Sequence, residues 1–246
     1  MDKALYISMT AAKHNLLAQT VHANNLANAN TTGFRADFAQ ARSMGVYYGD
    51  GYPSRAFALT ENPATDFSSG PMMSTGRDLD FAIEGDGFIA VQAPDGSEAY
   101  TRSGSLQLGP AGELLTAGGY PVMGAGGPIF FPPNSKIEIG SDGSVTTRGA
   151  TPLDLAEVDR IRLVNPDITQ LIKGKDGLLR LKEGEEALQE DPNIKLQSGF
   201  LEGSNVNAIS EFTDVLSLSR QYELSVKLMK TVEGNSQASA RLLQNS

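Results

Sequence analysis

The C-terminal stretch, residues 205–246, constrains the fold more than any other part of the chain. It contains no proline, and it begins with Asn205 and Asn207, which are both favourable helix N-cap residues. These features predict one uninterrupted helix that is longer than an ordinary domain helix. Spacings that alternate between three and four residues indicate a coiled-coil-like seam along it. The seam consists of Ala208, Phe212, Val215, Ser219, Tyr222, Val226 and Met229.

The same helix has a second apolar side. Leu224, Leu228 and Leu242 point away from the seam when residues are placed at 100° intervals. A helix that is apolar on two sides must contact more than one neighbour. One interpretation is a long helix buried within its own domain, and the other is a helix that also packs against further copies of the chain.

The start of the chain favours the second interpretation. Residues 1–29 predict another helix with a matching track, which again leaves other apolar residues facing elsewhere. The track consists of Leu5, Met9, Ala12, Leu16, Gln19, Ala23 and Leu26, and the residues facing elsewhere are Ile7, Leu17 and Val21. Two multi-sided helices at opposite ends of one chain predict that they pack on each other and on other copies, as in a filament subunit.

Four asparagines crowd the expected end of the N-terminal helix: Asn24, Asn25, Asn28 and Asn30. Gly33 is expected to supply the C-terminal stop. Helix termination accounts for Asn30 and Gly33, but it does not account for Asn24 and Asn25. An asparagine amide can cap free carbonyls or fix the register against a neighbouring helix, and both roles remain open.

A secretory signal peptide is the rival interpretation of the N-terminus. The apolar run over residues 4–12 is short and contains Ser8 and Thr10, which is unfavourable for such a peptide. The chain has no apolar run of about 18 residues, the length that spans a membrane. We therefore expect no cleaved signal peptide and no membrane insertion.

Charge separates the ends of the chain from its middle. Residues 1–43 carry a net charge of +2 and residues 204–246 carry none, so the total of −9 leaves −11 on the residues between. An acidic middle argues against nucleic acid or anionic lipid as a partner. Cysteine is absent, which excludes disulfides, structural zinc sites of the cysteine type and thiol chemistry.

The segments next to the predicted helices read as extended connectors. Residues 31–75 are rich in glycine, proline and aromatic residues, and residues 185–206 lead from an acidic loop toward the C-terminal helix. Aromatic side chains in a connector would be exposed without a partner, so we expect them to contact neighbouring subunits. These aromatic residues include Tyr47, Tyr48, Tyr52, Phe57 and Phe67.

Residues 76–184 are expected to form an all-β body that resembles a sandwich or a barrel. Its turn signals are Asp-Gly pairs and a Pro-Ala-Gly sequence, with short alternating or apolar runs between them. The turns are expected at residues 86–87, 95–96, 110–112, 142–143 and 176–177. The predicted core consists of Phe81, Ile83, Phe88, Ile89, Val91, Leu114, Val122, Ile137 and Leu163.

Four carboxylates, Asp78, Asp80, Glu84 and Asp86, invite an enzymatic or metal-binding interpretation. Their spacing does not match the calcium loop of an EF-hand, and in a strand they would share one solvated face. A periplasmic glycan-binding module or hydrolase that uses them is the alternative from a different class of protein. The two histidines lie two turns apart on one helix and cannot share a metal ion unaided. We predict no catalytic residue, no cofactor and no metal.

Three segments carry a resemblance to a known family. They are Met-Asp-Lys-Ala-Leu-Tyr at residues 1–6, the asparagine-rich residues 23–35, and Leu-Glu-Gly-Ser-Asn-Val-Asn at residues 201–207, which leads into Arg-Gln-Tyr-Glu at residues 220–223. Together they resemble the flagellar basal-body rod and hook proteins. The resemblance covers nearly the whole chain.

The resemblance implies a non-enzymatic subunit of the proximal rod, a hollow shaft that transmits torque and encloses the export channel. It implies an assembly domain from residues 1–30 and 207–246, and as partners the chain itself, other proximal and distal rod proteins and the flagellar type III export apparatus. The implied location is the periplasm-spanning rod. A distal rod or hook subunit is the alternative within the family. The expected assembly interface consists of Leu5, Met9, Leu16, Asn24, Asn25, Leu26, Asn28, Phe212, Val215, Tyr222, Val226 and Met229.

Overall fold

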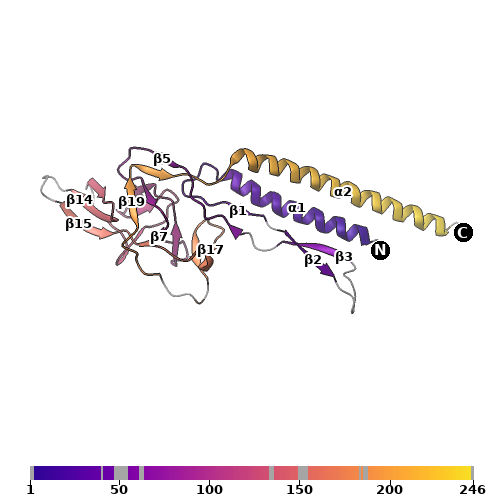
Figure 1. The fold of residues 1–246 in the computed structure, drawn as a ribbon, viewed down its shortest axis with the longest axis horizontal. Coiled ribbons are helices and arrows are strands. Elements are labelled where there is room, and N and C mark those ends of the chain that lie inside the picture. Colours follow the sequence, from indigo (N-terminus) through magenta and orange to yellow (C-terminus); the bar gives the residue numbers. More distant parts are fainter. Residues whose placement is uncertain are drawn as a thin grey trace. The chain divides into compact units, whose positions relative to one another are not determined.

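A helix lies at each end of the chain, and the segment between them contains the β-strands (Figure 1). The computed structural model describes residues 3–39, 41–46, 55–60, 64–132, 136–148, 155–182, 184 and 188–244. The chain divides into two units. The helical unit comprises Met1–Ala29, Ala36–Asp66 and Val206–Ser246, and the β unit comprises Asn30–Arg35 and Phe67–Asn205. The mixed α and β class predicted from the sequence is confirmed.

The helices α1 (Lys3–Ala27) and α2 (Ala208–Gln244) lie side by side in the helical unit and run in opposite directions (Figure 1). Asn207 caps α2, because its Oδ1 accepts the backbone N–H groups of Ile209 and Ser210 at 3.1 and 3.3 Å. The predicted long C-terminal helix is therefore present, and Asn207 rather than Asn205 is its cap. With 37 residues against 25, α2 is longer than α1 by roughly 18 Å at 1.5 Å per residue and extends past it.

The end of α1 differs from the prediction. The helix stops at Ala27, and the Asn28 N–H lies 3.2 and 3.1 Å from the carbonyl oxygens of Asn24 and Asn25. Asn28 Nδ2 also donates to the Asn24 carbonyl at 2.9 Å, so an asparagine amide caps this end. Gly33 has a φ of +69°, but it lies beyond the helix in the β unit. The expectation that Gly33 stops the helix is wrong, because Asn28 has already satisfied the last turn.

Two strand pairs follow α1 within the helical unit. Strand β2 (Ala41–Val46) pairs with β3 (Arg55–Thr60), and β1 (Asp37–Phe38) pairs with β4 (Ala64–Thr65). The stretch expected to be an extended connector thus contains two antiparallel strand pairs. The aromatic residues Tyr47, Tyr48 and Tyr52, predicted to contact neighbours, lie outside the described residues, as does the side chain of Phe57.

The strands of the β unit pair antiparallel in several sheets. A five-stranded sheet has the order β16-β7-β8-β18-β17, a three-stranded sheet has the order β13-β14-β15, and β5 with β20, β6 with β19, β9 with β10 and β11 with β12 form two-stranded sheets. The described strands close no barrel, so the barrel-like body expected from the sequence is not found among them. The bounds are β5 Met72–Ser74, β6 Phe81–Glu84, β7 Phe88–Gln92, β8 Glu98–Thr101, β9 Leu106–Leu108, β10 Leu114–Thr116, β11 Met123–Gly124, β12 Gly127–Pro128, β13 Lys136–Ile139, β14 Ser144–Arg148, β15 Leu155–Arg160, β16 Leu163–Val164, η1 Ile168–Gln170, β17 Leu171–Lys173, β18 Leu179–Leu181, β19 Lys195–Ser198 and β20 Phe200–Glu202.

Repeated aspartate-glycine turns connect these strands. In three of them the aspartate Oδ1 accepts the backbone N–H two residues later, and the intervening glycine has a φ of 80° to 82°. An L side chain is strained at such an angle, which explains why glycine occupies each position. These turns are centred on Gly96, Gly143 and Gly177, as predicted.

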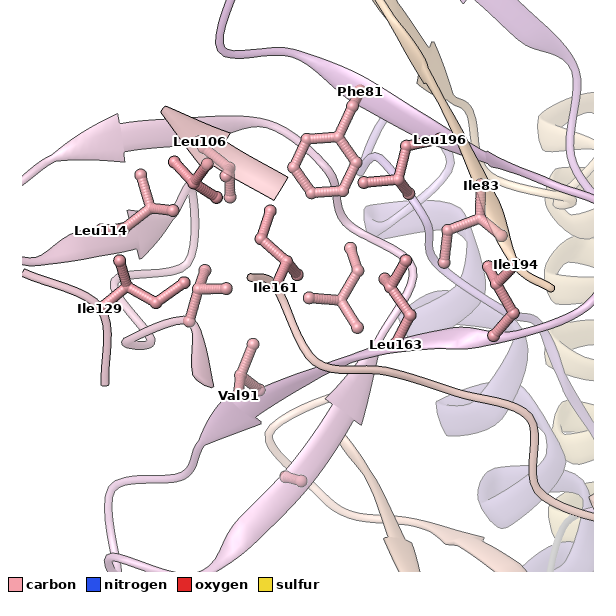
Figure 2. Close-up of a cluster of buried hydrophobic side chains, with 14 of the residues drawn as sticks. Phe81, Ile83, Val91, Leu106, Leu114, Ile129, Ile161, Leu163, Ile194 and Leu196 are labelled. Atoms are coloured by element: carbon pink, nitrogen blue, oxygen red, sulfur yellow. The ribbon is translucent and has the colours of Figure 1, made fainter. Parts of the chain in front are cut away.

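The main hydrophobic core lies within the β unit, and Figure 2 shows side chains from distant strands pointing toward one another. All nine predicted core residues are buried. Along β7, Ile89 and Val91 belong to this cluster, while Phe88 and Ala90 belong to a second cluster on the opposite face. Strand β7 is therefore buried on both faces, which is why its sequence is a continuous apolar run rather than an alternating one.

Candidate assembly surface

Small residues form the face of α1 that is buried. Ser8 and Ala12 are buried one turn apart, and the Ser8 hydroxyl donates to the Ala4 carbonyl at 2.8 Å. That bond satisfies the hydroxyl inside the helix, so its burial leaves no free polar group. On α2, Leu218, Ser225 and Val232 are half-buried at intervals of seven residues, and Ser219 and Val226 repeat the same interval. The other half-buried residues of α2 are Glu211, Val215 and Met229.

A polar cluster ties the end of α1 to the start of α2. His22 Nδ1 lies 2.6 Å from Glu211 Oε2, and Asn25 Nδ2 lies 3.3 Å from Glu211 Oε1. Asn25 also binds the chain that follows α1, because its Nδ2 donates to the Asp37 carbonyl at 2.8 Å and its Oδ1 accepts the Asp37 N–H at 3.0 Å. The buried Asn25 therefore fixes the register of two neighbouring segments, the second of the two roles open for these asparagines.

The predicted track on α1 is only partly on the buried face. Ala12 is buried and Leu5 and Leu26 are half-buried, but Met9 is 54 % exposed and Leu16 is 51 % exposed. The described residues buried on α1 are Ser8, Ala12 and Asn25. Met9 lies one residue, or about 100°, from Ser8, and Leu16 lies four residues, or about 40°, from Ala12. Within the single chain α1 therefore buries its smaller side chains, and an interface with other molecules through Met9 and Leu16 stays a prediction.

The predicted seam on α2 divides in the same way. Val215, Val226 and Met229 are half-buried, while Phe212 is 52 % and Tyr222 38 % exposed. Neither Asn24, which is exposed, nor the half-buried Asn28 shares the deep burial of Asn25. The single chain thus leaves several of the expected interface residues available to other molecules.

Both helices carry large apolar side chains outward, although they are already packed on each other. We call these residues the outer apolar faces. Exposed apolar surface of this kind marks a site of interaction with another molecule. The outer apolar faces consist of Tyr6, Ile7, Met9, Leu16 and Leu17 on α1 and Ile209, Phe212, Leu216, Tyr222, Leu224, Leu228 and Leu242 on α2.

The far end of α2 is exposed in the part of the helical unit that the structure describes. Every described side chain between residues 233 and 244 is exposed, because α2 continues past the first residues of α1 (Figure 1). We call residues 233–244 the overhang. Its largest described apolar side chain, Leu242, is 74 % exposed in the single chain.

The four carboxylates of the β unit do not form the solvated strand face that the sequence predicts. Asp78, Glu84 and Asp86 are exposed, but Asp80 is 1 % exposed and lies 3.6 Å from Arg77 Nη1. Asp80 precedes β6 and its backbone carbonyl accepts the Gly199 N–H at 2.7 Å, so it is part of the packing of this region. Within the described ranges, no group of three or more histidine and carboxylate side chains is placed to hold a metal ion.

In the described part of the chain, no helix combines the length and the apolar character needed to cross a bilayer. This holds for α1 and for α2, whose apolar residues are interrupted by charged and polar ones.

Comparisons with known proteins match the terminal helices and the β unit separately. Residues 5–35 match the model of the flagella basal body rod protein, residues 82–147 that of the flagellar hook protein FlgE/F/G D1 domain, and residues 197–242 that of the flagellar basal body rod FlgEFG protein C-terminal region. The flagellar basal-body rod proteins FlgF of Escherichia coli K12 and of Salmonella typhimurium LT2 are each 40 % identical over 253 residues, covering all of both chains. The chain belongs to the flagellar basal-body rod protein family. A rod protein named FlgG, from Buchnera aphidicola of Schizaphis graminum, is 32 % identical and aligns with 94 % of this chain and 96 % of its own.

Membership of the rod family makes the chain a structural protein of the flagellar basal body and not an enzyme. The model matched by residues 5–35 begins and ends in two of the segments that carried the resemblance in the sequence, and the match over residues 197–242 contains the third, together with residues 220–223. They also contain residues to which sequence reasoning assigned no role. Arg35 and Glu202 lie in two of those segments, and with Arg102 they form a buried ion cluster in the β unit.

Proposed function

We propose that this chain is a subunit of the proximal rod, and that it assembles through the outer apolar faces into a hollow shaft that transmits torque and encloses the export channel. The observation that carries the proposal is the outward position of large apolar side chains on both helices of an already packed pair. Such residues cost solubility in a single chain and contribute about 1.5 to 3 kcal/mol each once they are fully buried by a neighbour.

The same proposal assigns a role to each segment of the chain. Residues 1–30 and 207–246 form the assembly domain, in which helices of neighbouring subunits pair in a coiled-coil-like manner. Residues 31–75 and 185–206 serve as connectors, and residues 76–184 form the outer domain. The partners are further copies of the chain, other proximal rod proteins and the distal rod, across the periplasm. Delivery occurs through the flagellar type III export apparatus, and a fold that needs no disulfide suits that route.

A distal rod or hook subunit is the nearest alternative. The 40 % identity to FlgF of Escherichia coli K12 and of Salmonella typhimurium LT2, against 32 % to the FlgG relative, favours the proximal rod. The glycan-binding or hydrolytic alternative finds less support, because Asp80 is buried away from the other three carboxylates.

The test begins with mass spectrometry of purified basal bodies, in which the wild-type chain should be present. The variant Leu224→Asp then places a charge on the outer apolar face of α2, where Leu224 is 66 % exposed. Because the side chain is exposed in the single chain, stability toward urea should change by less than about 0.5 kcal/mol. Burial of an unpaired charge in an assembled rod is costly, so this variant should be exported but missing from basal bodies.

Lys230→Asp is the matched control, because Lys230 is exposed on the same helix and already carries a charge. It should enter basal bodies and support swimming. The proposal fails if the wild-type chain is missing from basal bodies, or if exported Leu224→Asp protein enters them as well as the control does.

A further inference from the structure

The buried carboxylate of Glu202 lies where separate segments of the β unit meet. Its Oε1 lies 2.7 Å from Arg35 Nη1 and accepts the Gly70 N–H at 3.0 Å. Its Oε2 accepts a hydrogen bond from Arg102 Nη1 at 3.1 Å. Arg35, Arg102 and Glu202 are each at most 5 % exposed, and we call these three residues the Glu202 cluster. One carboxylate therefore joins three segments that are distant in sequence.

Backbone hydrogen bonds hold the same segments together. The Glu202 carbonyl accepts the Gly33 N–H at 2.8 Å, and the Gly203 N–H donates to the Pro71 carbonyl at 2.8 Å. Strand β20, which ends at Glu202, pairs with β5. The segments next to Gly33, Pro71 and Glu202 thus form one hydrogen-bonded group around the cluster.

These segments are also the ones by which the chain passes between its two units. The crossings lie between residues 29 and 30, 35 and 36, 66 and 67, and 205 and 206. Each is a few residues from a segment that the Glu202 cluster holds. Asn205 lies at the last crossing, and its Nδ2 donates to the Ser68 carbonyl at 3.2 Å. This bond connects the last crossing to the segment that follows the crossing between residues 66 and 67.

Glycines allow these segments to approach one another closely. A Cβ atom added at Gly70 would lie 2.1 Å from the Gly203 carbonyl oxygen, and one added at Gly33 would lie 2.4 Å from the Arg102 carbonyl carbon. No side chain fits at such distances unless the backbone moves. The close approach requires glycine at both positions, so the arrangement depends on this sequence.

A buried ion cluster is a poor way to gain stability alone, since apolar residues of similar size are often equally stabilising. Burial lowers the pKa of Arg102; Glu202 opposes that effect, and the positive charge of Arg35 adds to it. The cluster instead fixes the relative positions of the segments that carry its three side chains. Arg102 also donates from Nη2 to the Gly85 carbonyl at 2.7 Å, so the carboxylate and this carbonyl together fix its planar guanidinium.

We propose that the Glu202 cluster fastens the segments at all four crossings together. We call the segments that it holds, around Gly33, Gly70 and Gly203, the joint. The joint can open without unfolding of the β-unit core, and it carries load between the two units. The fastening is a property of the single chain. The load-bearing role rests on the proposed function as a rod subunit.

Amide hydrogen exchange of the purified chain tests the fastening. Glu202→Gln removes the negative charge and places an amide N–H group next to two arginines, while Gly70→Ala opens the same joint by steric clash. In both variants the amides of Gly33 and Gly203 should exchange at least tenfold faster than in the wild type, and so should the amide of Gly70 in Glu202→Gln. The amides of β7, in the core, should keep their wild-type rates.

Two control variants match these changes. Glu98→Gln neutralises a carboxylate of the β unit that lies 3.2 Å from Arg162 Nη1, and Gly126→Ala adds a methyl group where no atom lies within 4 Å. Neither should change exchange at the joint. The fastening is refuted if either Glu202→Gln or Gly70→Ala leaves the joint amides protected. It is also refuted if β7 exchanges faster by the same factor, because the cluster would then be an ordinary part of the core.

Swimming in media of increasing viscosity tests the load-bearing role. Cells with the Glu202→Gln chain should incorporate it into basal bodies and swim as the wild type does in dilute buffer. Their speed should fall several-fold more steeply as viscosity rises, whereas Glu98→Gln cells should follow the wild type. An unchanged dependence on viscosity, or absence of the Glu202→Gln chain from basal bodies that contain the wild-type chain, would overturn this role. Absence of the wild-type chain itself would instead refute the proposed function.

Discussion

The substitution Asn25→Ala should release the start of α2 and strand β1 from α1. Asn25 is only 1 % exposed, and its amide makes three hydrogen bonds, two to the backbone of Asp37 and one to Glu211. Alanine can make none of them. The helix itself should not suffer, since alanine is a better helix former than asparagine.

The magnitude follows from those three bonds. A neutral hydrogen bond contributes about 0.5 to 1.5 kcal/mol, and one to a charged group about 1.5 to 3 kcal/mol. The bond to Glu211 is long at 3.3 Å, and Glu211 keeps its contact with His22 in the variant, so its share lies at the lower end. The expected loss in the free energy of unfolding of the helical unit is therefore about 2.5 to 4.5 kcal/mol.

Urea unfolding followed by the helical circular dichroism signal measures this loss, because both helices lie in the helical unit. With a slope of about 2 kcal/mol per molar urea, the midpoint should fall by roughly 1 to 2 M. Asn24→Ala is the matched control, since Asn24 is exposed on the same turn and should shift the free energy by less than about 0.5 kcal/mol. Equal shifts in the two variants, or no shift in Asn25→Ala, would show that Asn25 does not fix this register.

Further predictions concern other parts of the molecule. Ala12→Leu should overpack the buried face of α1 and cost about 1 to 3 kcal/mol in urea unfolding, and an unchanged midpoint would mean that the helices are not in close contact there. Neutralising the exposed carboxylates with Asp78→Asn and Glu84→Gln should change the unfolding free energy by less than about 1 kcal/mol and leave swimming intact, whereas loss of a metal signal would revive the binding-module interpretation. The two hydrogen bonds from Arg180, at 3.0 and 2.6 Å, lower the pKa of Asp176, so this carboxylate stabilises the fold above its unfolded pKa, and the contribution is lost as pH falls through the lowered value. Arg180→Gln should return the pKa of Asp176 toward its ordinary value in a nuclear magnetic resonance titration, and an unchanged pKa would contradict this cause.

The β-unit core was predictable because its residues are large, apolar and separated by strong turn signals. Phe81, Ile89 and Val91 lie in runs that can only be buried strands, and the aspartate-glycine turns need glycine for its backbone freedom. That the described strands close no barrel could not be predicted in the same way. Strand pairing over long separations, such as β6 with β19, leaves no local pattern in the sequence.

The contacts of α1 were harder to predict because hydrophobic periodicity identifies apolar faces without identifying their partners. Met9 and Leu16 form as regular a track as the buried one, yet they point outward. Ser8 and Asn25 give no apolar signal, and their burial depends on hydrogen bonds that only the folded chain provides. The predicted exposure of Asp80 was wrong for the same reason, since an alternating pattern predicts that every polar residue in it is exposed.

The mobility of the overhang of α2 should differ between a free chain and a chain that is part of a rod. A helix end that buries little apolar surface gains little free energy to offset its lost backbone entropy, so we expect its helicity in solution to be marginal. Burial against an adjacent subunit would supply the missing free energy and slow its motion. A spin label at Ser236, an exposed position on the overhang, should therefore give a narrow, mobile spectrum from free chains and a broad, immobilised one from finished rods. The same label would allow the rate of rod growth to be followed in real time from a single position.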